Sequence, residues 1–350
     1  MDAKIIAKEK LPALLELISR DYRLIAPVRE EDTVTLFKQV AGGREVDLDY
    51  HNSNIPPKAY LFPQSEKILS YVREPGSLEI REPGGSNKQV LFGVRPCDVK
   101  SILALDPVFN GAFPDEYYRD KRENTTLVAL SCTRVMPTCF CGAFGSGPCD
   151  SRGADLMFTD LGEQYYVEIV TDKGLALVDL YRELFSGRDL EKAAAAKDAL
   201  ALKLSNSFYR QVDLTGVKEV LDCNFDLPYW EEISRKCIGC GICTFVCPTC
   251  HCFDIFDHTF GRSEGSRFRC WDSCMFPDFT RMAGGHNPRP TKKERVRNRF
   301  MHKLKYHQDR YGLDGCVGCG RCIDRCPVNM DITRIISDIK EVGSSFKIDK

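Results

Sequence analysis

Two cysteine runs in the last third of the chain constrain this sequence more than any other feature. Each run has the spacing C-x2-C-x2-C-x3-C-P, which in bacterial ferredoxins holds [4Fe–4S] clusters. The first run contains Cys237, Cys240, Cys243 and Cys247, and the second contains Cys316, Cys319, Cys322 and Cys326. Two matches in one chain predict two [4Fe–4S] clusters.

The spacing also predicts which cysteines share a cluster. Three cysteines two residues apart can wrap one cubane, while the fourth, before proline, ligates the other cluster. Glycines between the cysteines let the backbone approach the sulfides and donate N–H groups to them. Zinc is the weaker interpretation, because zinc sites usually use separated C-x2-C pairs. We assign one cluster to Cys237, Cys240, Cys243 and Cys326, and the other to Cys316, Cys319, Cys322 and Cys247.

The 18 cysteines in this 350-residue chain do not fit a disulfide framework. Such frameworks are typical of short secreted chains, whereas this chain is long, is 43% hydrophobic and begins without a signal-peptide pattern. We therefore expect a cytoplasmic protein with cysteines as metal ligands. No apolar segment approaches the roughly 18 residues of a membrane span. A net charge of −1 gives no reason to expect binding to nucleic acid or membranes.

The sequence predicts an α/β domain over residues 1–225. Short apolar runs predict buried strands, and apolar residues at helical spacing predict helices between them. A mainly α-helical, ferredoxin-type domain with the two clusters is expected over residues 226–350. Helices are predicted at Ala3–Arg20, Val99–Leu105, Leu175–Phe185, Glu191–Leu204 and Thr291–Gln308, and strands at Arg23–Val28, Thr33–Val40, Gln89–Val94, Thr126–Leu130 and Tyr165–Val170.

A second group of cysteines lies in the α/β part. Cys97 and Cys132 each follow a predicted strand, and Cys139 and Cys141 lie in a glycine-containing loop. If the two strands are parallel neighbours, their carboxyl ends converge where such sheets build sites. These four cysteines could bind a third [4Fe–4S] cluster, with Cys149 as a substitute. The alternative is buried structural thiols. About twelve irons per chain would support three clusters, and about eight would remove the third.

Other cysteines and the histidines have less defined roles. Cys250, Cys252, Cys270 and Cys274 could hold a further metal or pack beside the clusters, and Cys223 is expected to be structural. The sequence assigns no ligand role to His251, His258 or His286.

A basic stretch separates the two runs. Residues 281–310 contain ten Lys or Arg against Glu294 and Asp309. The expected roles are balancing cluster charge, raising cluster potentials and docking a partner, rather than binding nucleic acid.

Several longer motifs together resemble one protein family. They are GVRPCDVKSILALD, CFCGAFGSG, CPTCHCFDIFD, WDSC, FTRMAGGHNPRP and RNRFMHKLKYH. Their order and spacing resemble the beta subunits of cytoplasmic nickel–iron sulfhydrogenases and the A subunit of anaerobic sulfite reductase. The resemblance implies a cytoplasmic heteromeric complex and implies that Cys97, Cys132, Cys139 and Cys141 are cluster ligands.

The resemblance also implies a function. In such complexes a flavin subunit exchanges electrons with NAD(P)H, and the beta-type subunit relays single electrons to a hydrogenase or a sirohaem sulfite reductase. Related subunits also occur beside heterodisulfide reductases. The chain itself carries no dinucleotide fingerprint and no P-loop. Our hypothesis is a non-catalytic electron-transfer subunit of an anaerobic oxidoreductase complex.

Two rival hypotheses remain open. In one, the chain is itself an iron–sulfur reductase of sulfur compounds, with Cys250, Cys252 and Cys274 as a metal centre or a redox-active thiol. In the other, the chain is a cluster-based redox sensor.

Overall fold

The computed structural model describes residues 2–345, and its N-terminal part is built on a seven-stranded mixed sheet. The strand order is β1-β9-β8-β7-β6-β2-β3. The four central strands are parallel, and β9, β1 and β3 run antiparallel to their neighbours. The strands are β1 (Ala3–Ala7), β2 (Arg23–Glu31), β3 (Val34–Gln39), β6 (Gln89–Val94), β7 (Thr125–Leu130), β8 (Leu156–Asp160) and β9 (Gln164–Ile169).

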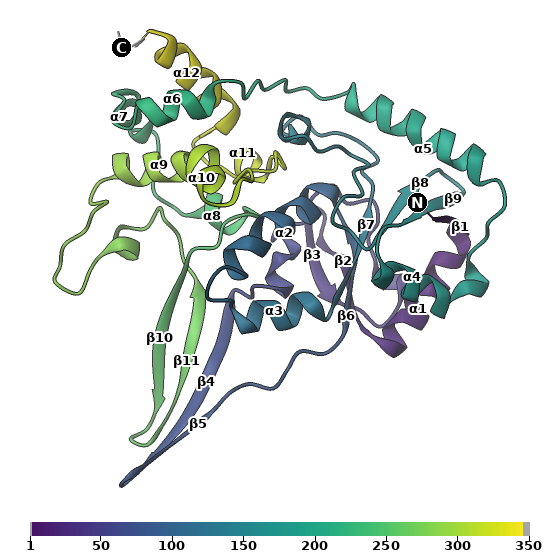
Figure 1. The fold of residues 1–350 in the computed structure, drawn as a ribbon, viewed down its shortest axis with the longest axis horizontal. Helices are drawn as coiled ribbons and strands as arrows, with labels where there is room; N and C mark the ends of the chain where they lie inside the picture. The colour runs from purple at the N-terminus through teal and green to yellow at the C-terminus, as the bar shows by residue number, and fades with distance from the viewer. Residues whose placement is uncertain (1, 346–350) are drawn as a thin grey trace.

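Helices cover both faces of this sheet, as Figure 1 shows. One face packs against α1 (Leu11–Asp21) and α4 (Asp172–Leu180). The other packs against α2 (Pro96–Phe109) and α3 (Glu116–Glu123). Because central strands are buried on both sides, they have nearly continuous apolar sequences. The predicted α/β architecture of the N-terminal part is therefore confirmed.

The predicted helix over Ala3–Arg20 is wrong in its first half. Residues 3–7 form strand β1, which pairs antiparallel with β9, and α1 begins only at Leu11. Ile5 and Ile6 are both buried, one on each face of the strand. Two adjacent apolar residues fit a helix and a two-sided strand equally well, so sequence periodicity could not distinguish them.

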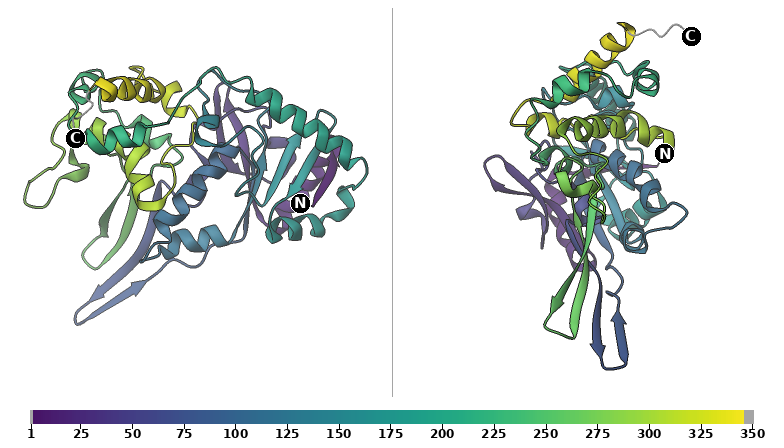
Figure 2. Two further views of the ribbon diagram at one scale, coloured as in Figure 1. Left: turned by 45° about the horizontal axis from the view of Figure 1, so that its top comes forward. Right: turned by 90° about the vertical axis from the view of Figure 1, so that its left-hand side faces the viewer.

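A second sheet forms an arm that projects from the body (Figure 2). This four-stranded antiparallel sheet has the order β10-β11-β4-β5. Its strands are β4 (Ser65–Glu74), β5 (Ser77–Arg81), β10 (Phe253–Phe260) and β11 (Glu264–Trp271). The expectation of a mainly helical C-terminal domain is not confirmed, because β10 and β11 belong to it. Strands from both sides of residue 225 pair in the arm, and a domain boundary there stays a prediction.

The rest of the C-terminal part is helical and surrounds the ferredoxin-type runs. A long helix, α5 (Leu190–Ser205), leads toward it from the edge of the α/β part (Figure 1). The predicted helix in the basic stretch is confirmed, with a π-helical segment in its middle. The other helices are α6 (Val217–Cys223), α7 (Tyr229–Ser234), α8 (Ile242–Phe245), α9 (Lys292–Met301), the π-helix η7 (His302–Tyr306), α10 (His307–Tyr311), α11 (Arg321–Asp324) and α12 (Ile332–Ser345).

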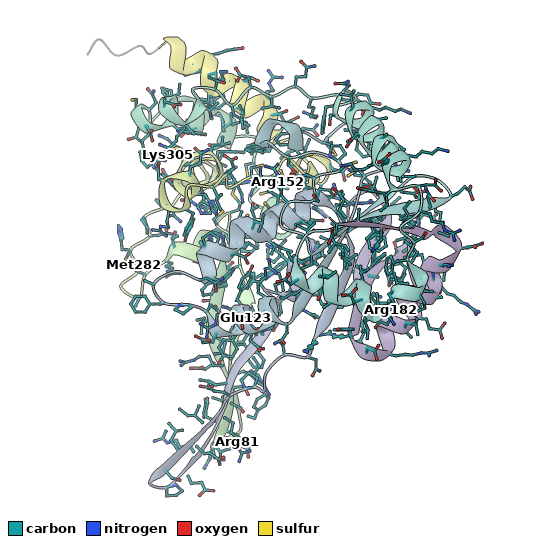
Figure 3. The ribbon with its side chains drawn as sticks, turned by 45° about the vertical axis from the view of Figure 1, so that its right-hand side comes forward. Arg81, Glu123, Arg152, Arg182, Met282 and Lys305 are labelled. Atoms are coloured by element: carbon teal, nitrogen blue, oxygen red, sulfur yellow. The ribbon has the colours of Figure 1, made fainter. Side chains whose placement is uncertain are left out.

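Short 3-10 turns complete the described elements. They are η1 (Lys8–Lys10), η2 (Gly43–Glu45), η3 (Pro57–Tyr60), η4 (Cys141–Phe144), η5 (Arg182–Leu184) and η6 (Pro277–Thr280). Figure 3 marks the arm with Arg81 and the π-helical segment with Lys305, and the two lie well apart. Among the residues that the structure describes, no helix has the length and apolar character needed to span a membrane.

Candidate metal centres

The first set of cysteines, Cys237, Cys240, Cys243 and Cys326, lines one small cavity. Three of them lie on α8 or the loop before it, and the fourth follows α11. The N–H of Gly239 donates to Cys237 Sγ at 3.4 Å, and the N–H of Met330 donates to Cys326 Sγ at 3.2 Å. Backbone donors of this kind stabilise thiolates that ligate a cluster.

The second set, Cys247, Cys316, Cys319 and Cys322, lines a second cavity. Here the N–H of Gly318 donates to Cys316 Sγ at 3.5 Å, and the Thr249 hydroxyl lies 3.2 Å from Cys247 Sγ. Each predicted set, including the cysteine from the other run, therefore comes together. The glycines between the cysteines have φ values of 72° and 75° in the first run and 64° and 78° in the second. Glycine adopts this left-handed backbone at least cost.

Two buried cations lie among these cysteines. Arg299 lines both cavities and is 5% exposed, and Lys303 lines the second cavity and is 2% exposed. Burial opposes the charged form of Lys303, but the Cys247 thiolate, with a further contribution from the sulfur of Cys250, outweighs burial and raises the pKa of Lys303. None of the ion pairs formed within residues 2–345 involves either cation.

A net negative iron–sulfur cluster would supply the missing counter-charge. Eight cysteine sulfurs, backbone N–H donors and unpaired buried cations therefore fit two such clusters. Within the described part of the chain, no three His, Cys, Asp or Glu side chains are arranged to hold a single metal ion.

The third set, Cys97, Cys132, Cys139 and Cys141, lies at the carboxyl edge of the large sheet. Strands β6 and β7 are parallel neighbours, as the sequence argument required. Cys97 lies in the first turn of α2, directly after β6, and Cys132 lies just beyond β7. Electrostatic interactions link Cys141 to each of the other three cysteines. Burial raises the pKa of Cys139 to about 12.

The third set lies directly beside the second. Cys319 interacts electrostatically with Cys97, Cys139 and Cys141. The N–H of Phe140 donates to the carbonyl of Gly318 at 2.9 Å. A Cβ added at Gly318 would come within 2.5 Å of the Phe140 carbonyl oxygen, so this close contact requires glycine. Cys149, the proposed substitute, interacts with Cys132.

Sequence reasoning missed His51. Its Nε2 lies 3.1 Å from Cys139 Sγ. Burial, aided by Arg95 and Arg321, lowers the pKa of His51 to about 3, so the imidazole is neutral. A neutral imidazole can donate to a thiolate or ligate a metal. A lone histidine far from any cysteine motif gave no signal in the sequence.

A buried ion pair ties the third set to the second. Arg321, within the second run, donates to both carboxylate oxygens of Asp98 at 2.7 Å. Asp98 directly follows Cys97, and both partners are almost fully buried. The guanidinium also donates to the Ser53 carbonyl at 2.9 Å. This bidentate pair fixes the α/β part against the ferredoxin-type loop.

The remaining cysteines separate into two groups. Cys250, Cys252 and Cys274 gather beside the second set and line a cavity of about 820 Å³. Cys270 instead lies in the arm, 3.3 Å from the Ser65 hydroxyl, and Cys223 is exposed at the end of α6.

Of the histidines considered from sequence, only His251 lies in this region. Its ring centroid is 5.2 Å from that of His302 and 6.5 Å from that of His307. Burial, with a contribution from Lys303, lowers the pKa of His251 to about 3. His258 lies on the arm, and His286 lies in the loop before α9.

Comparisons with known proteins identify the family of this chain. The family model described as "4Fe-4S dicluster domain" matches residues 236–330. The chain is 32% identical over 335 residues to sulfhydrogenase 2 subunit beta of Pyrococcus furiosus, covering 95% of this chain and 97% of that subunit. No solved structure matches the chain. The chain therefore belongs to the family of sulfhydrogenase beta subunits and carries a C-terminal 4Fe–4S dicluster domain.

Proposed function

We propose that this chain is an electron-transfer subunit that holds three [4Fe–4S] clusters. The clusters are held by the first, second and third sets of cysteines. In this proposal the chain relays single electrons between a flavin subunit that uses NAD(P)H and a hydrogenase or reductase subunit. Its matched relative is named as a sulfhydrogenase subunit, which supports assembly with other subunits.

The contiguity of the three sets is the observation that carries the proposal. Cys319 of the second set interacts with the third set, and Cys322 of the second set also lines the cavity of the first. The sets therefore follow one another in the order third, second, first. One-electron exchange is the chemistry that such clusters supply when bound.

The chain's own residues would hold and tune these groups. The N–H donors to sulfur and the buried cations Arg299 and Lys303 stabilise added negative charge, which favours the reduced state. The first set lies nearest the surface, because Cys240 is exposed and the neighbouring Ile238 is 61% exposed. We place one point of electron entry or exit there.

An iron count tests the number of clusters. We expect about twelve irons and twelve acid-labile sulfides per anaerobically purified chain. Cys139→Ser or Cys141→Ser should lower the count by about four, with the electron paramagnetic resonance signals of the other two clusters retained. Cys223→Ser is the matched control and should change nothing. A native chain with about eight irons would remove the third cluster.

Co-purification tests the assignment as a relay. The tagged full-length chain is isolated anaerobically from its own organism, and its partners are identified by mass spectrometry. A flavin subunit together with a hydrogenase or a sirohaem reductase would support the relay. A cluster-loaded chain that co-purifies with no flavin, hydrogenase or reductase subunit would overturn it.

A further inference from the structure

The proposed relay makes no use of the cavity lined by Cys250, Cys252 and Cys274. None of these three cysteines belongs to the first, second or third set. Cys250 and Cys274 are 6% and 7% exposed, while Cys252 is half-buried at the cavity wall. The cavity, of about 820 Å³, has the volume of a small-molecule site.

Two of the three cysteines form a close pair. Cys252 and Cys274 lie side by side, because both line the cavity and both pack in the same cluster, and the interaction with Cys274 lowers the pKa of Cys252. The arm holds this contact in place, because Phe253 pairs with Trp271 in the ladder and the N–H of Asp272 donates to the Cys252 carbonyl at 3.0 Å. Two neighbouring thiols on paired segments need little movement to form a disulfide.

The pair is connected to the second set through a third sulfur. The N–H of Cys250 donates to the carbonyl of Cys247, a member of the second set, at 3.4 Å. Cys250 also interacts electrostatically with Cys274. Sulfur atoms therefore lead from the second set to the cavity in the order Cys247, Cys250, Cys274, Cys252.

The cavity is built for an anion. Beside Arg299 and Lys303, which the clusters would neutralise, its wall carries Arg289 and Arg310, and its single acidic side chain, Asp309, pairs with Lys218 and Lys305. Part of this wall is the π-helix η7, and such segments are frequent at functional sites. An excess of positive charge in a concave site favours negatively charged ligands.

We propose that Cys252 and Cys274 form a redox-active dithiol–disulfide pair that reduces a small anionic disulfide bound in this cavity. The inference rests on the proposed function, because the second cluster would be the source of the electrons. The pair would convert the one-electron steps of the clusters into a two-electron reduction.

The reaction balances in three steps. The Cys252 thiolate attacks one sulfur of the bound disulfide, whose S–S bond breaks, and one product leaves as a thiolate. Cys274 then loses its proton to that thiolate and attacks Cys252 Sγ, which releases the second thiolate and forms the Cys252–Cys274 disulfide. Two electrons, which the second cluster would supply when bound, and one proton restore the Cys252 thiolate and the Cys274 thiol.

Redox poising of the loaded chain tests the pair directly. The anaerobic holoprotein is equilibrated at a series of potentials, its free thiols are alkylated, and each cysteine peptide is quantified by mass spectrometry. We expect Cys252 and Cys274 to change from thiol to disulfide together. The ratio of thiol to disulfide should change tenfold for about every 30 mV, which is the slope of a two-electron couple. The exposed Cys223 serves as the alkylation control. If both cysteines remain thiols over the whole range, the proposal fails.

Variants separate the pair from a metal site. Cys252→Ser and Cys274→Ser should keep the full iron count and the resonance signals of all clusters. Each should reduce oxidised glutathione, an anionic disulfide, at least 100-fold more slowly with electrons from reduced viologen. Cys223→Ser should match the unaltered chain. Loss of iron in either variant would make the pair metal ligands, and unchanged glutathione reduction would exclude the pair from the reaction.

The charge of the substrate gives a further test. We expect oxidised glutathione to be reduced faster than the neutral bis(2-hydroxyethyl) disulfide. Arg310→Gln should decrease the ratio of these two rates severalfold. Equal rates for the two disulfides would overturn the anionic assignment. Clusters that cycle normally beside an inert pair would reject this inference alone, whereas absent clusters would reject the proposed function.

Discussion

At the residue scale, Arg299 exerts the most direct electrostatic influence on the proposed clusters, because its side chain lines both the first and second cavities. Arg299→Gln removes one positive charge from a buried position. The reduced clusters carry more negative charge, so they lose more stabilisation than the oxidised ones. At about 7 Å and an effective dielectric of about 20, one charge contributes roughly 2 kcal/mol. We therefore expect the reduction potentials of the first and second clusters each to fall by about 50–100 mV.

Redox titration followed by electron paramagnetic resonance measures this shift. Arg281→Gln is the matched control, since its side chain is 63% exposed and pairs with Asp278 at the surface. The cluster potentials of the Arg281→Gln variant should stay within about 10 mV of those of the unaltered chain, because exposed charges are screened. Equal shifts in the two variants would contradict a specific role for Arg299.

Cys252 provides a second prediction at this scale. Hydrogen bonds from Cys274, with smaller contributions from Lys303 and Lys58, lower the pKa of Cys252 despite its burial. The thiolate is therefore present at pH 7 and is lost as the pH falls through this lowered value. Cys274→Ala removes the side-chain donor and raises the pKa of Cys252, so its alkylation by iodoacetamide at pH 7 should slow about threefold.

Cys274→Ser is the matched variant for this measurement. The serine hydroxyl can still donate to Cys252 Sγ, so alkylation should remain close to that of the unaltered chain. The rate is followed by mass spectrometry of the peptide that contains Cys252. An identical slowing in both variants would show that hydrogen bonding does not control the thiolate.

The sequence predicted which cysteines of the two runs lie together, because the spacing of cluster ligands is a local pattern. The cubane spacing groups Cys237, Cys240 and Cys243, and the proline rule brings in Cys326. The contact between His51 and Cys139 and the pair between Asp98 and Arg321 join segments far apart in the chain. No local pattern marks such contacts, since they depend on how the second run packs against the large sheet.

At the element scale, the glycines of the two cysteine runs differ in what lies beside them. Gly239 and Gly318 occupy the same place in their runs and both have positive φ. A Cβ at Gly239 would find its nearest neighbour, the Met275 carbonyl oxygen, at 3.8 Å. A Cβ at Gly318 would lie 2.5 Å from the Phe140 carbonyl oxygen and 2.6 Å from the Cys141 N. Only the second run is therefore packed against the loop of the third set.

Gly318→Ala should consequently separate the second run from that loop. We expect loss of about four irons from the third set and destabilisation by several kcal/mol, since backbone must move to relieve the contact. Gly239→Ala imposes the same left-handed backbone on alanine but no clash, so it should cost about 1 kcal/mol and keep all the iron. Iron analysis and anaerobic urea unfolding make the comparison. Matching losses in the two variants would contradict the docking argument.

Prediction from sequence succeeded for elements with strong local patterns. β6 and β7 are continuous apolar runs, and α5 and α9 have clear helical composition. The arm was missed, because β5 and β10 are exposed along their whole length and show no buried face. Their stability depends on pairing between residues 65–81 and 253–271, which only the three-dimensional structure reveals.

At the scale of the whole molecule, the charge of the clusters and the stability of the fold are coupled. Lys303 is buried without a carboxylate partner within residues 2–345, and its contacts are the Thr249 hydroxyl at 2.6 Å and nearby cysteine sulfurs. In the loaded protein, negative clusters offset this charge. Without iron, burial raises the pKa of Cys316 to about 12, so that thiol is neutral, and the two buried cations Lys303 and Arg299 share the single thiolate of Cys247, whose pKa is lowered. An uncompensated buried charge costs several kcal/mol.

Lys303→Met should therefore have opposite effects in the two forms of the protein. With clusters bound, it removes a favourable interaction and should lower the free energy of unfolding by about 1–3 kcal/mol. After iron removal by an anaerobic chelator, it removes an unpaired buried charge and should raise the stability of the iron-free chain by a similar amount. The unaltered chain should lose several degrees in melting temperature on chelation, and the variant distinctly fewer.

Lys305→Met distinguishes this reversal from a general effect of losing a lysine in η7. Lys305 pairs with Asp222 and Asp309, so its positive charge is matched whether or not iron is present. We expect a small loss of stability, about 1 kcal/mol or less, of the same sign in both forms. Calorimetry measures the stability of the unaltered chain, Lys303→Met and Lys305→Met, each with clusters bound and after chelation. If Lys303→Met destabilised both forms alike, the buried ammonium would be bound by the protein itself, and the clusters would not be its counter-ions.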